Sequence, residues 1–176
     1  MTDPVIIEDY DPLWPERFAL LRTRIGAALG SLAVAIEHVG STAVPGLAAK
    51  PTIDMDILLR SSADLPLVII RLASLGYEHR GDLGVSGREA FRTPPADFPH
   101  HLYVCPPHSQ EFQRHIAFRN HLRTHADDAR AYADLKRNLA SQFREDREAY
   151  NQAKTGFVTE ILSRTSRNFS PPCAYH

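Results

Sequence analysis

Two short stretches decide how this chain folds: residues 37–42 read EHVGST, and residues 53–57 read IDMDI. In a β-strand, successive side chains point to opposite faces of the sheet. Asp54 and Asp56 are therefore predicted to share one face, while the apolar residues that alternate with them face the other way. Two adjacent carboxylates repel each other unless a cation lies between them, and such oxygen ligands suit Mg²⁺ or Mn²⁺. The second stretch thus predicts a metal site at Asp54 and Asp56.

The first stretch supplies a Gly-Ser turn made of Gly40, Ser41 and Thr42. A short helix is expected over residues 42–47, kept brief by a Pro-Gly pair. If the turn leads into a helix, its backbone N–H groups and the positive helix end form a phosphate site. The two stretches together therefore indicate a site for a metal and a phosphate.

Two residues next to these stretches have both a structural and a functional interpretation. His38 either supports the turn or belongs to the site. Lys50 is either an exposed surface lysine or, being close in sequence to the two acids, a phosphate-binding residue that balances their charge. Both are kept as candidates.

Composition limits the classes of partner. The 176 residues carry a formal net charge of −1, so a nucleic-acid partner is not expected. Two cysteines give no disulfide framework, which fits a reducing compartment. The N-terminus has no cationic leader with an apolar core, and no apolar run approaches the roughly 20 residues of a membrane span. We therefore expect a cytoplasmic protein without membrane association.

The apolar spacing predicts an α/β (α+β) fold, with an N-terminal helix, an α/β half and a C-terminal helical half. Helices are expected at 14–29, 64–75, 110–124, 127–144 and 146–164, and strands at 31–39, 52–59, 77–79, 89–92 and 101–104. No linker separates the halves. We therefore expect one domain over residues 1–168, with an α/β half (1–108), a helical half (109–165) and a flexible tail at 169–176.

Single cations interrupt the apolar stripes of the three predicted C-terminal helices. Arg119, Lys136 and Lys154 each lie among apolar residues at i, i+3, i+4 spacing. A cation on such a stripe is costly unless it is paired or snorkels to solvent. Three cations on faces that must pack against the α/β half also fit a second interpretation, in which they point across a cleft at phosphates.

The nine histidines raise the question of zinc. His100, His101, His108, His115, His121 and His125 fall in one third of the chain. No His-Glu-x-x-His motif occurs, and no acid stands between His121 and His125. Most of these histidines are therefore expected at the surface or at helix ends.

The spacing of the two opening stretches resembles a known signature. The pattern consists of a hydrophobic-Gly-Ser motif, a gap of twelve residues between Ser41 and Asp54, and an Asp-hydrophobic-Asp-hydrophobic motif. It resembles the signature of the nucleotidyltransferase superfamily. The longer run EHVGSTAVPGLAAKPTIDMDILL is identified as that of a member of the GrpB-like family. The resemblance continues through HLYVCPP, RHIAFRNHLRTHADDARAYADLKRNLA and DREAYNQAKTGFV, and covers residues 10 to 163.

This resemblance implies a nucleotidyltransferase-like fold with a mixed sheet, in which Asp54 and Asp56 hold the metal on a nucleoside triphosphate. In active members of the superfamily, a third carboxylate on a later strand helps to activate the acceptor. The corresponding strand here offers His101 and Tyr103 and no acid. His101 could complete the metal site or act as a general base in its place.

Three functions remain open from the sequence. The first is a metal-dependent nucleotidyltransferase that joins a nucleotide to a small acceptor. The second is a module that binds a nucleotide or phosphorylated metabolite without transfer, which the missing third carboxylate favours. The third is a metal-dependent phosphohydrolase that uses water as the acceptor.

Overall fold

The computed structural model describes residues 4–95 and 98–167 of the chain. Within these residues a five-stranded sheet has the strand order β1-β2-β5-β4-β3. Strands β2 and β5 run parallel, and the other neighbouring strands run antiparallel. The strands are β1 (Ala33–Val39), β2 (Ile53–Leu59), β3 (Glu78–His79), β4 (Glu89–Arg92) and β5 (His100–Cys105). The predicted mixed sheet is therefore confirmed, while the predicted flexible tail at 169–176 lies outside the described residues.

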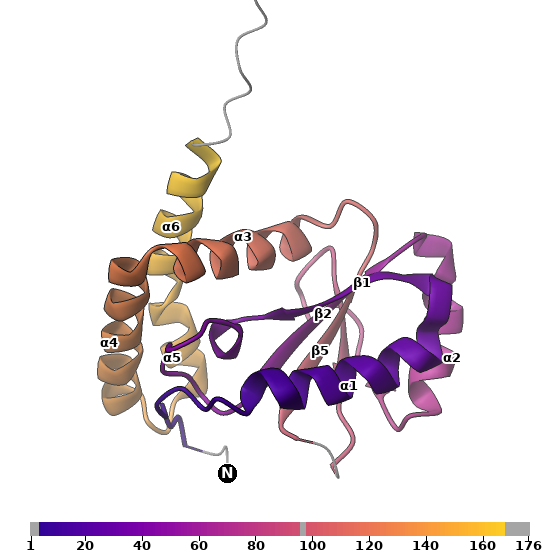
Figure 1. The fold of residues 1–176 in the computed structure, drawn as a ribbon, viewed down its shortest axis with the longest axis horizontal. Coiled ribbons are helices and arrows are strands. Elements are labelled where there is room, and N and C mark those ends of the chain that lie inside the picture. The colour runs from indigo at the N-terminus through magenta and orange to yellow at the C-terminus, as the bar shows by residue number, and fades with distance from the viewer. Residues whose placement is uncertain (1–3, 96–97, 168–176) are drawn as a thin grey trace, which may run out of the picture.

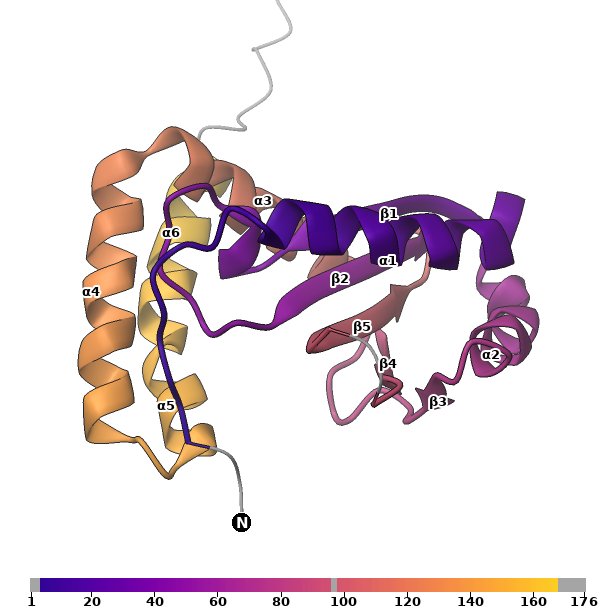
Figure 2. The same cartoon turned by 60° about the horizontal axis from the view of Figure 1, so that its bottom comes forward.

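One face of the sheet packs against two helices, α1 (Trp14–Leu29) and α2 (Leu65–Ala73) (Figures 1 and 2). Met55 and Ile57 of β2 are fully buried in this core, where they meet apolar side chains from both helices. The alternation of β2 therefore turns Asp54 and Asp56 towards the opposite face. This is the arrangement expected from the IDMDI stretch.

The turn after β1 differs from the expectation. In place of a helix over residues 42–47 there is a single 3₁₀ turn, η2 (Ser41–Ala43), and Gly46 has a positive φ of 78°. Proline and a glycine in this conformation stop helix propagation. Two further 3₁₀ turns are η1 (Gly30–Leu32) and η3 (Ser62–Asp64). A phosphate site at this turn would therefore rely on η2 and not on a longer helix.

The helical half begins with α3 (Gln110–Thr124), which crosses the sheet on the side opposite α1 (Figure 1). It continues through α4 (Ala126–Gln142), α5 (Arg147–Ala153) and α6 (Thr155–Arg167). The expectation of one helix over 146–164 is wrong, because the helix divides at Lys154. Threonine and glycine follow at positions 155 and 156, and both propagate a helix poorly. None of the helices in the described ranges is long and apolar enough to cross a membrane.

The segment between η2 and β2 joins the two halves. Its apolar residues Val44, Leu47 and Ala48 are buried against Leu122 of α3 and Tyr132 of α4. This packing holds the Gly-Ser turn and the acidic strand beside the helices that carry the predicted cations. The fold therefore places the two sets of candidate residues close together.

Candidate functional site

A cavity of about 400 Å³ lies between strands β2 and β5 on one side and the helical half on the other. Carboxylate, imidazole, hydroxyl, aromatic and ammonium groups all contribute to its wall. The structure brings the following predicted candidates to this wall: Gly40, Ser41, Thr42, Lys50, Asp54, His101, Tyr103, Lys136 and Lys154. Residues far apart in the sequence thus meet around one space.

Asp54 is the accessible carboxylate of the pair, with 33% of its side chain exposed. Its Oδ1 lies 2.8 Å from Nδ1 of His101, the residue directly beside it on β5. Burial raises the pKa of Asp54, but the hydrogen bond from His101 and the neighbouring groups His115 and Lys50 together outweigh this and hold the pKa below its ordinary value. Asp54 is therefore an ionised carboxylate at the cavity wall.

Asp56 lies deeper and is fully buried. Its Oδ2 lies 2.7 Å from Nδ1 of His115, and its Oδ1 is buried without a hydrogen-bond partner. Burial raises the pKa of Asp56 despite the hydrogen bond from His115. Burial lowers the pKa of His115, but the hydrogen bond to Asp56 and the charges of Asp56, Glu111 and Asp54 together outweigh this effect and raise it. An unpartnered buried carboxylate oxygen is costly, and a cation beside it would remove that cost.

His115 is a site residue that the sequence did not reveal. We expected it at the surface, yet it lines the cavity and covers Asp56 from α3. The two residues are 59 positions apart, and no local pattern connects them. Only the path of α3 across the sheet brings them together. Arg147, Tyr132 and Tyr150 were missed for the same reason.

His101 contacts both halves of the molecule. Its Nδ1 faces Asp54, and its Nε2 lies 3.3 Å from Nη2 of Arg147 on α5. A guanidinium only donates hydrogen bonds, so Nε2 of His101 accepts and its Nδ1 carries the proton that is donated to Asp54. In this arrangement the Nε2 lone pair of His101 is directed at the guanidinium of Arg147.

Cations form the wall across from Asp54. Lys136 on α4 is 2% exposed; its ammonium donates to the carbonyl of Ala48 and lies 4.6 Å from the ring centroid of Tyr132. The ammonium of Lys154 lies 4.3 Å, and that of Lys50 5.5 Å, from the ring centroid of Tyr150. Aromatic faces thus replace part of the water around three ammonium groups.

Burial lowers the pKa of Lys136 to about 7, and the neighbouring charge of Lys154 adds to this effect. Burial likewise lowers the pKa of Lys154 to about 8, with a further contribution from Lys50. The pKa of Lys50 is lowered by burial and by the charge of Arg147. These cations repel one another in a partly desolvated space. An anion bound between them would relieve that repulsion.

The Gly-Ser turn approaches Asp54 closely. Gly40 has φ 72° and ψ −171°, a conformation that essentially only glycine adopts. A Cβ atom at this position would lie 2.2 Å from Oδ2 of Asp54. Thr42 is anchored by its hydroxyl, which lies 2.9 Å from Nε2 of His38. The turn is therefore fixed against the acidic strand.

Arg119 and His38 are placed away from this cavity. Nη1 of Arg119 donates to Oε2 of Glu37 at 2.7 Å and to the carbonyl of His38 at 2.8 Å. His38 stacks on Phe18 with ring centroids 4.7 Å apart, and burial lowers its pKa to about 4. Both residues line a neighbouring hollow of about 290 Å³. The expectation that Arg119 points at the phosphate cleft is therefore corrected: it ties α3 to β1.

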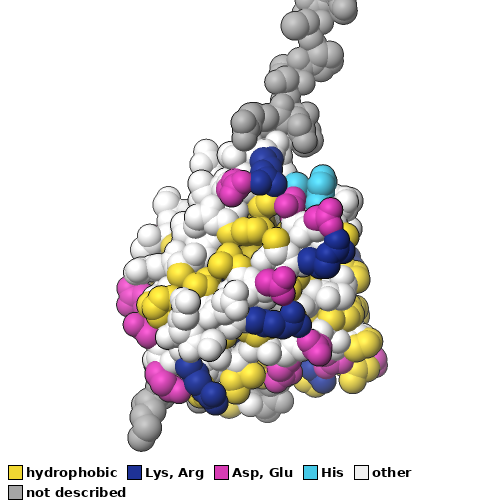
Figure 3. Space-filling model, turned by 90° about the vertical axis from the view of Figure 1, so that its left-hand side faces the viewer, with side chains coloured by type: hydrophobic (Ala, Val, Ile, Leu, Met, Phe, Trp, Pro, Cys, Tyr) yellow, Lys and Arg dark blue, Asp and Glu magenta, His cyan; other side chains and the backbone are white. Residues whose placement is uncertain are grey.

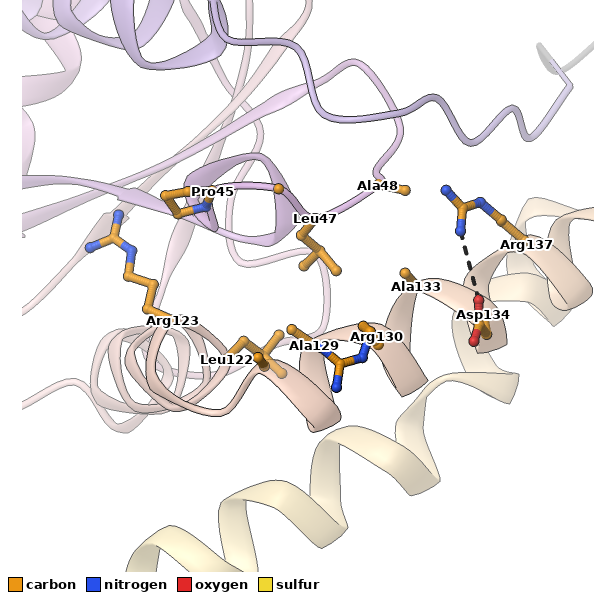
Figure 4. A pocket seen from close by; sticks show the side chains of 12 residues that line it. Pro45, Leu47, Ala48, Leu122, Arg123, Ala129, Arg130, Ala133, Asp134 and Arg137 are labelled. Carbon is orange, nitrogen blue, oxygen red and sulfur yellow. Dashed lines mark ion pairs between the residues drawn. The ribbon is translucent and has the colours of Figure 1, made fainter.

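A third hollow, of about 410 Å³, lies between residues 45–48 and helices α3 and α4 (Figure 4). Its carboxylate, Asp134, forms an ion pair with Arg137 at 3.7 Å. Figure 3 shows the outer side of the helical half, where acidic and basic side chains are interspersed among hydrophobic ones. Because this hollow lacks paired acids and a cluster of buried cations, the cavity at Asp54 is the stronger candidate site.

Comparison with known proteins identifies relatives that span nearly the whole chain. Residues 4–164 match the family model described as GrpB protein. A UPF0157 protein of Pseudomonas aeruginosa is 40% identical over 166 residues, which cover 92% of this chain and 68% of that protein. A crystal structure of the conserved protein GrpB from Enterococcus faecalis matches with a TM-score of 0.84 and 33% identity, covering 93% of this chain and 99% of that chain.

A shorter match has a named enzyme activity. A stretch of 77 residues is 38% identical to a dephospho-CoA kinase of Mycolicibacterium paratuberculosis and covers 42% of this chain and 19% of that protein. The match is too short to define a family, whereas the longer matches do so. The family resemblance predicted from the sequence is confirmed: this chain belongs to the GrpB family.

Proposed function

We propose that this chain is a metal-dependent, nucleotidyltransferase-like protein that acts on a nucleotide and a small acceptor. One observation carries the proposal: the ionised Asp54 and the cations Lys50, Lys136, Arg147 and Lys154 line the same cavity. A carboxylate that can hold a metal and cations that can hold phosphates are the two requirements of phosphoryl and nucleotidyl transfer.

The residues present fit a divalent cation that takes most of its ligands from substrate and water. Oδ1 of Asp56 is buried without a partner, and Asp54 stands two residues away on the same face of β2. The described residues contain no group of three or more His, Cys, Asp or Glu side chains suited to a metal. Mg²⁺ or Mn²⁺ commonly uses one or two carboxylates together with phosphates. When bound by Asp54 and Asp56, the ion would neutralise phosphate charge.

The chain's own groups would position the ligand. The ammonium groups of Lys136 and Lys154 and the guanidinium of Arg147 would bind phosphate oxygens. Held by Gly40 against Asp54, the hydroxyl of Ser41 and the backbone N–H groups of the turn would donate to the same phosphates. A bound phosphate that drew the guanidinium of Arg147 away from His101 would leave Nε2 of His101 available to accept a proton from the acceptor.

The second candidate is a module that binds a nucleotide or phosphorylated metabolite without transfer. The residues beside Asp54 and Asp56 on β5 are His101 and Tyr103, so neither supplies a third carboxylate. A third candidate, a phosphohydrolase, would use water as the acceptor at the same site. The short match to a dephospho-CoA kinase supports including dephospho-CoA among the ligands to be screened.

Pyrophosphate release tests the proposal. The protein is incubated with each nucleoside triphosphate, Mg²⁺ and a metabolite pool that includes dephospho-CoA. We expect release in the wild type, loss of release in Asp54→Asn, and normal release in Asp127→Asn, whose carboxylate is 93% exposed on α4. Nucleotide binding without release would favour the binding module. Release that needs no acceptor would favour the phosphohydrolase.

A further inference from the structure

The aromatic rings beside the cations of the cavity have covered faces, and this affects which part of a ligand the proposed site can recognise. Building on the proposed function, we infer that the cavity recognises the polyphosphate chain of its ligand and is indifferent to the nucleobase. Its ligands would be any nucleoside triphosphate, and inorganic tripolyphosphate alone would bind about as tightly.

The charge of the cavity matches a multiply charged chain. Lys50 precedes β2, Lys136 lies on α4, Arg147 lies on α5, and Lys154 stands where α5 meets α6. The pKa of each lysine is lowered by the charge of at least one other member of this group, so the cations lie within electrostatic reach of one another. A single phosphate cannot contact cations from four segments as well as a chain of three can. The arrangement therefore favours a polyphosphate over a monophosphate.

The aromatic rings among these cations are not available to stack a base. Tyr150 is fully buried beneath Lys50 and Lys154. Tyr132 is 5% exposed; it stacks on Phe157 at 5.0 Å between centroids and lies beneath the ammonium of Lys136. Stacking of a nucleobase on an aromatic side chain requires an open ring face. These rings instead hold the cations in place.

On the strand side, one face of the Tyr103 ring is covered. The guanidinium carbon of Arg88 lies 4.2 Å from the ring centroid of Tyr103. Among the described residues that line the cavity, Asn151 supplies an amide side chain, and it is exposed. Selective recognition of a base edge requires buried polar groups that a wrong base leaves unpaired. The described wall offers no such buried amide, so we expect the base to remain outside the cationic part of the cavity.

Calorimetric titration with and without Mg²⁺ tests this inference. The ligands are ATP, GTP, CTP, UTP, inorganic tripolyphosphate, AMP and orthophosphate. We expect the four triphosphates and tripolyphosphate to bind within about threefold of one another, and AMP and orthophosphate to bind at least about tenfold more weakly, because they lose charge-assisted contacts.

Two variants identify the binding site. Lys154→Gln is expected to weaken tripolyphosphate binding about tenfold, whereas Arg130→Gln, which alters a cation on α4 that is 70% exposed and lies outside the cavity, should leave it unchanged. Tight binding of one triphosphate with at least tenfold weaker tripolyphosphate would overturn the inference and leave the proposed function standing. Equal losses in both variants would overturn the inference as well, because they would indicate nonspecific attraction of anions. If no ligand binds, both the inference and the proposed function fail.

Discussion

Gly40 and Asp54 are in such close contact that a methyl group on Gly40 would lie 2.2 Å from Oδ2 of Asp54. The two halves of the opening sequence pattern are therefore one structural unit. The glycine allows the turn to approach the carboxylate, and this contact fixes the position of Ser41. This contact explains physically why a Gly-Ser turn and an acidic strand occur together.

The substitution Gly40→Ala should break the close contact between the Gly-Ser turn and Asp54. Its φ of 72° and ψ of −171° are unfavourable for alanine, and the added methyl group meets a carboxylate instead of open space. We expect a loss of about 3 kcal/mol in the free energy of unfolding, together with weaker binding of Mg²⁺ and nucleotide. Urea denaturation and calorimetric titration measure the two effects.

Gly46→Ala is the matched control for this substitution. Gly46 has a similar φ of 78°, but nothing lies within 4 Å of the position that its Cβ would take. A loss of about 1 kcal/mol is expected, from the positive φ alone. Equal losses in the two variants would show that the contact with Asp54 does not matter.

Lys136→Met should separate function from stability. Lys136 is 2% exposed, and burial lowers its pKa to about 7, so the folded protein gains little from the charge itself. We expect a loss of about 1–2 kcal/mol in the free energy of unfolding, because the buried carbonyl of Ala48 loses its donor, while affinity for tripolyphosphate falls at least about tenfold. Loss of stability with unchanged affinity would make Lys136 a purely structural residue.

The pH dependence of binding and of stability should have opposite signs. Lys136 and Lys154 lose their charge near pH 7 and pH 8, so affinity for tripolyphosphate should fall as pH rises through this range. In the unfolded chain the same lysines keep their protons up to about pH 10.4. The unfolded state therefore binds more protons between about pH 7 and 10, and the contribution of these groups to stability rises with pH.

Calorimetry in two buffers of different ionisation enthalpy measures this coupling directly. At pH 8 the bound anion should raise the pKa of both lysines, so binding should be accompanied by proton uptake. An affinity that is constant from pH 6.5 to 8.5 would contradict the assignment of these lysines to the ligand.

Arg119→Met should affect stability and leave the cavity intact. Arg119 is 8% exposed, and its guanidinium holds Glu37 and the backbone of His38 against α3. Its removal leaves a buried carbonyl unpaired, and we expect a loss of about 2–3 kcal/mol in the free energy of unfolding. Arg114→Met, on the same helix but 53% exposed, should cost less than about 0.5 kcal/mol. A selective loss of ligand affinity in Arg119→Met would restore the original interpretation of this residue.

The sequence predicted the elements well where a periodic pattern spans the element. Helix α1 and strand β4 begin and end where expected, because Trp14, Leu21 and Ile25 mark a helical stripe and Glu89–Arg92 stands between glycine and proline turns. The predicted last helix failed at Lys154, since its apolar stripe continues across the break between α5 and α6. Periodicity does not report such a break in the backbone.

The sequence predicted only those site residues that belong to a local sequence pattern. Asp54 and Gly40 belong to one short motif, and Lys136 stands out as a cation on an apolar stripe. His115 and Arg147 carry no such local signal, because their role depends on which helix passes over which strand. Arg119 had the same signal as Lys136, yet an acid on β1 lies within its reach. Sequence spacing cannot distinguish a cation paired with a carboxylate from one that faces a cavity.

The central claim is that Asp54 and the facing cations form a metal-dependent site for nucleoside triphosphates. Calorimetric titration of the wild type and of Asp54→Asn with each nucleoside triphosphate, with and without Mg²⁺, tests it most directly. The account predicts that Mg²⁺ strengthens binding to the wild type and that this effect of Mg²⁺ disappears in Asp54→Asn. Failure of every nucleoside triphosphate to bind the wild type, with or without Mg²⁺, would contradict the account.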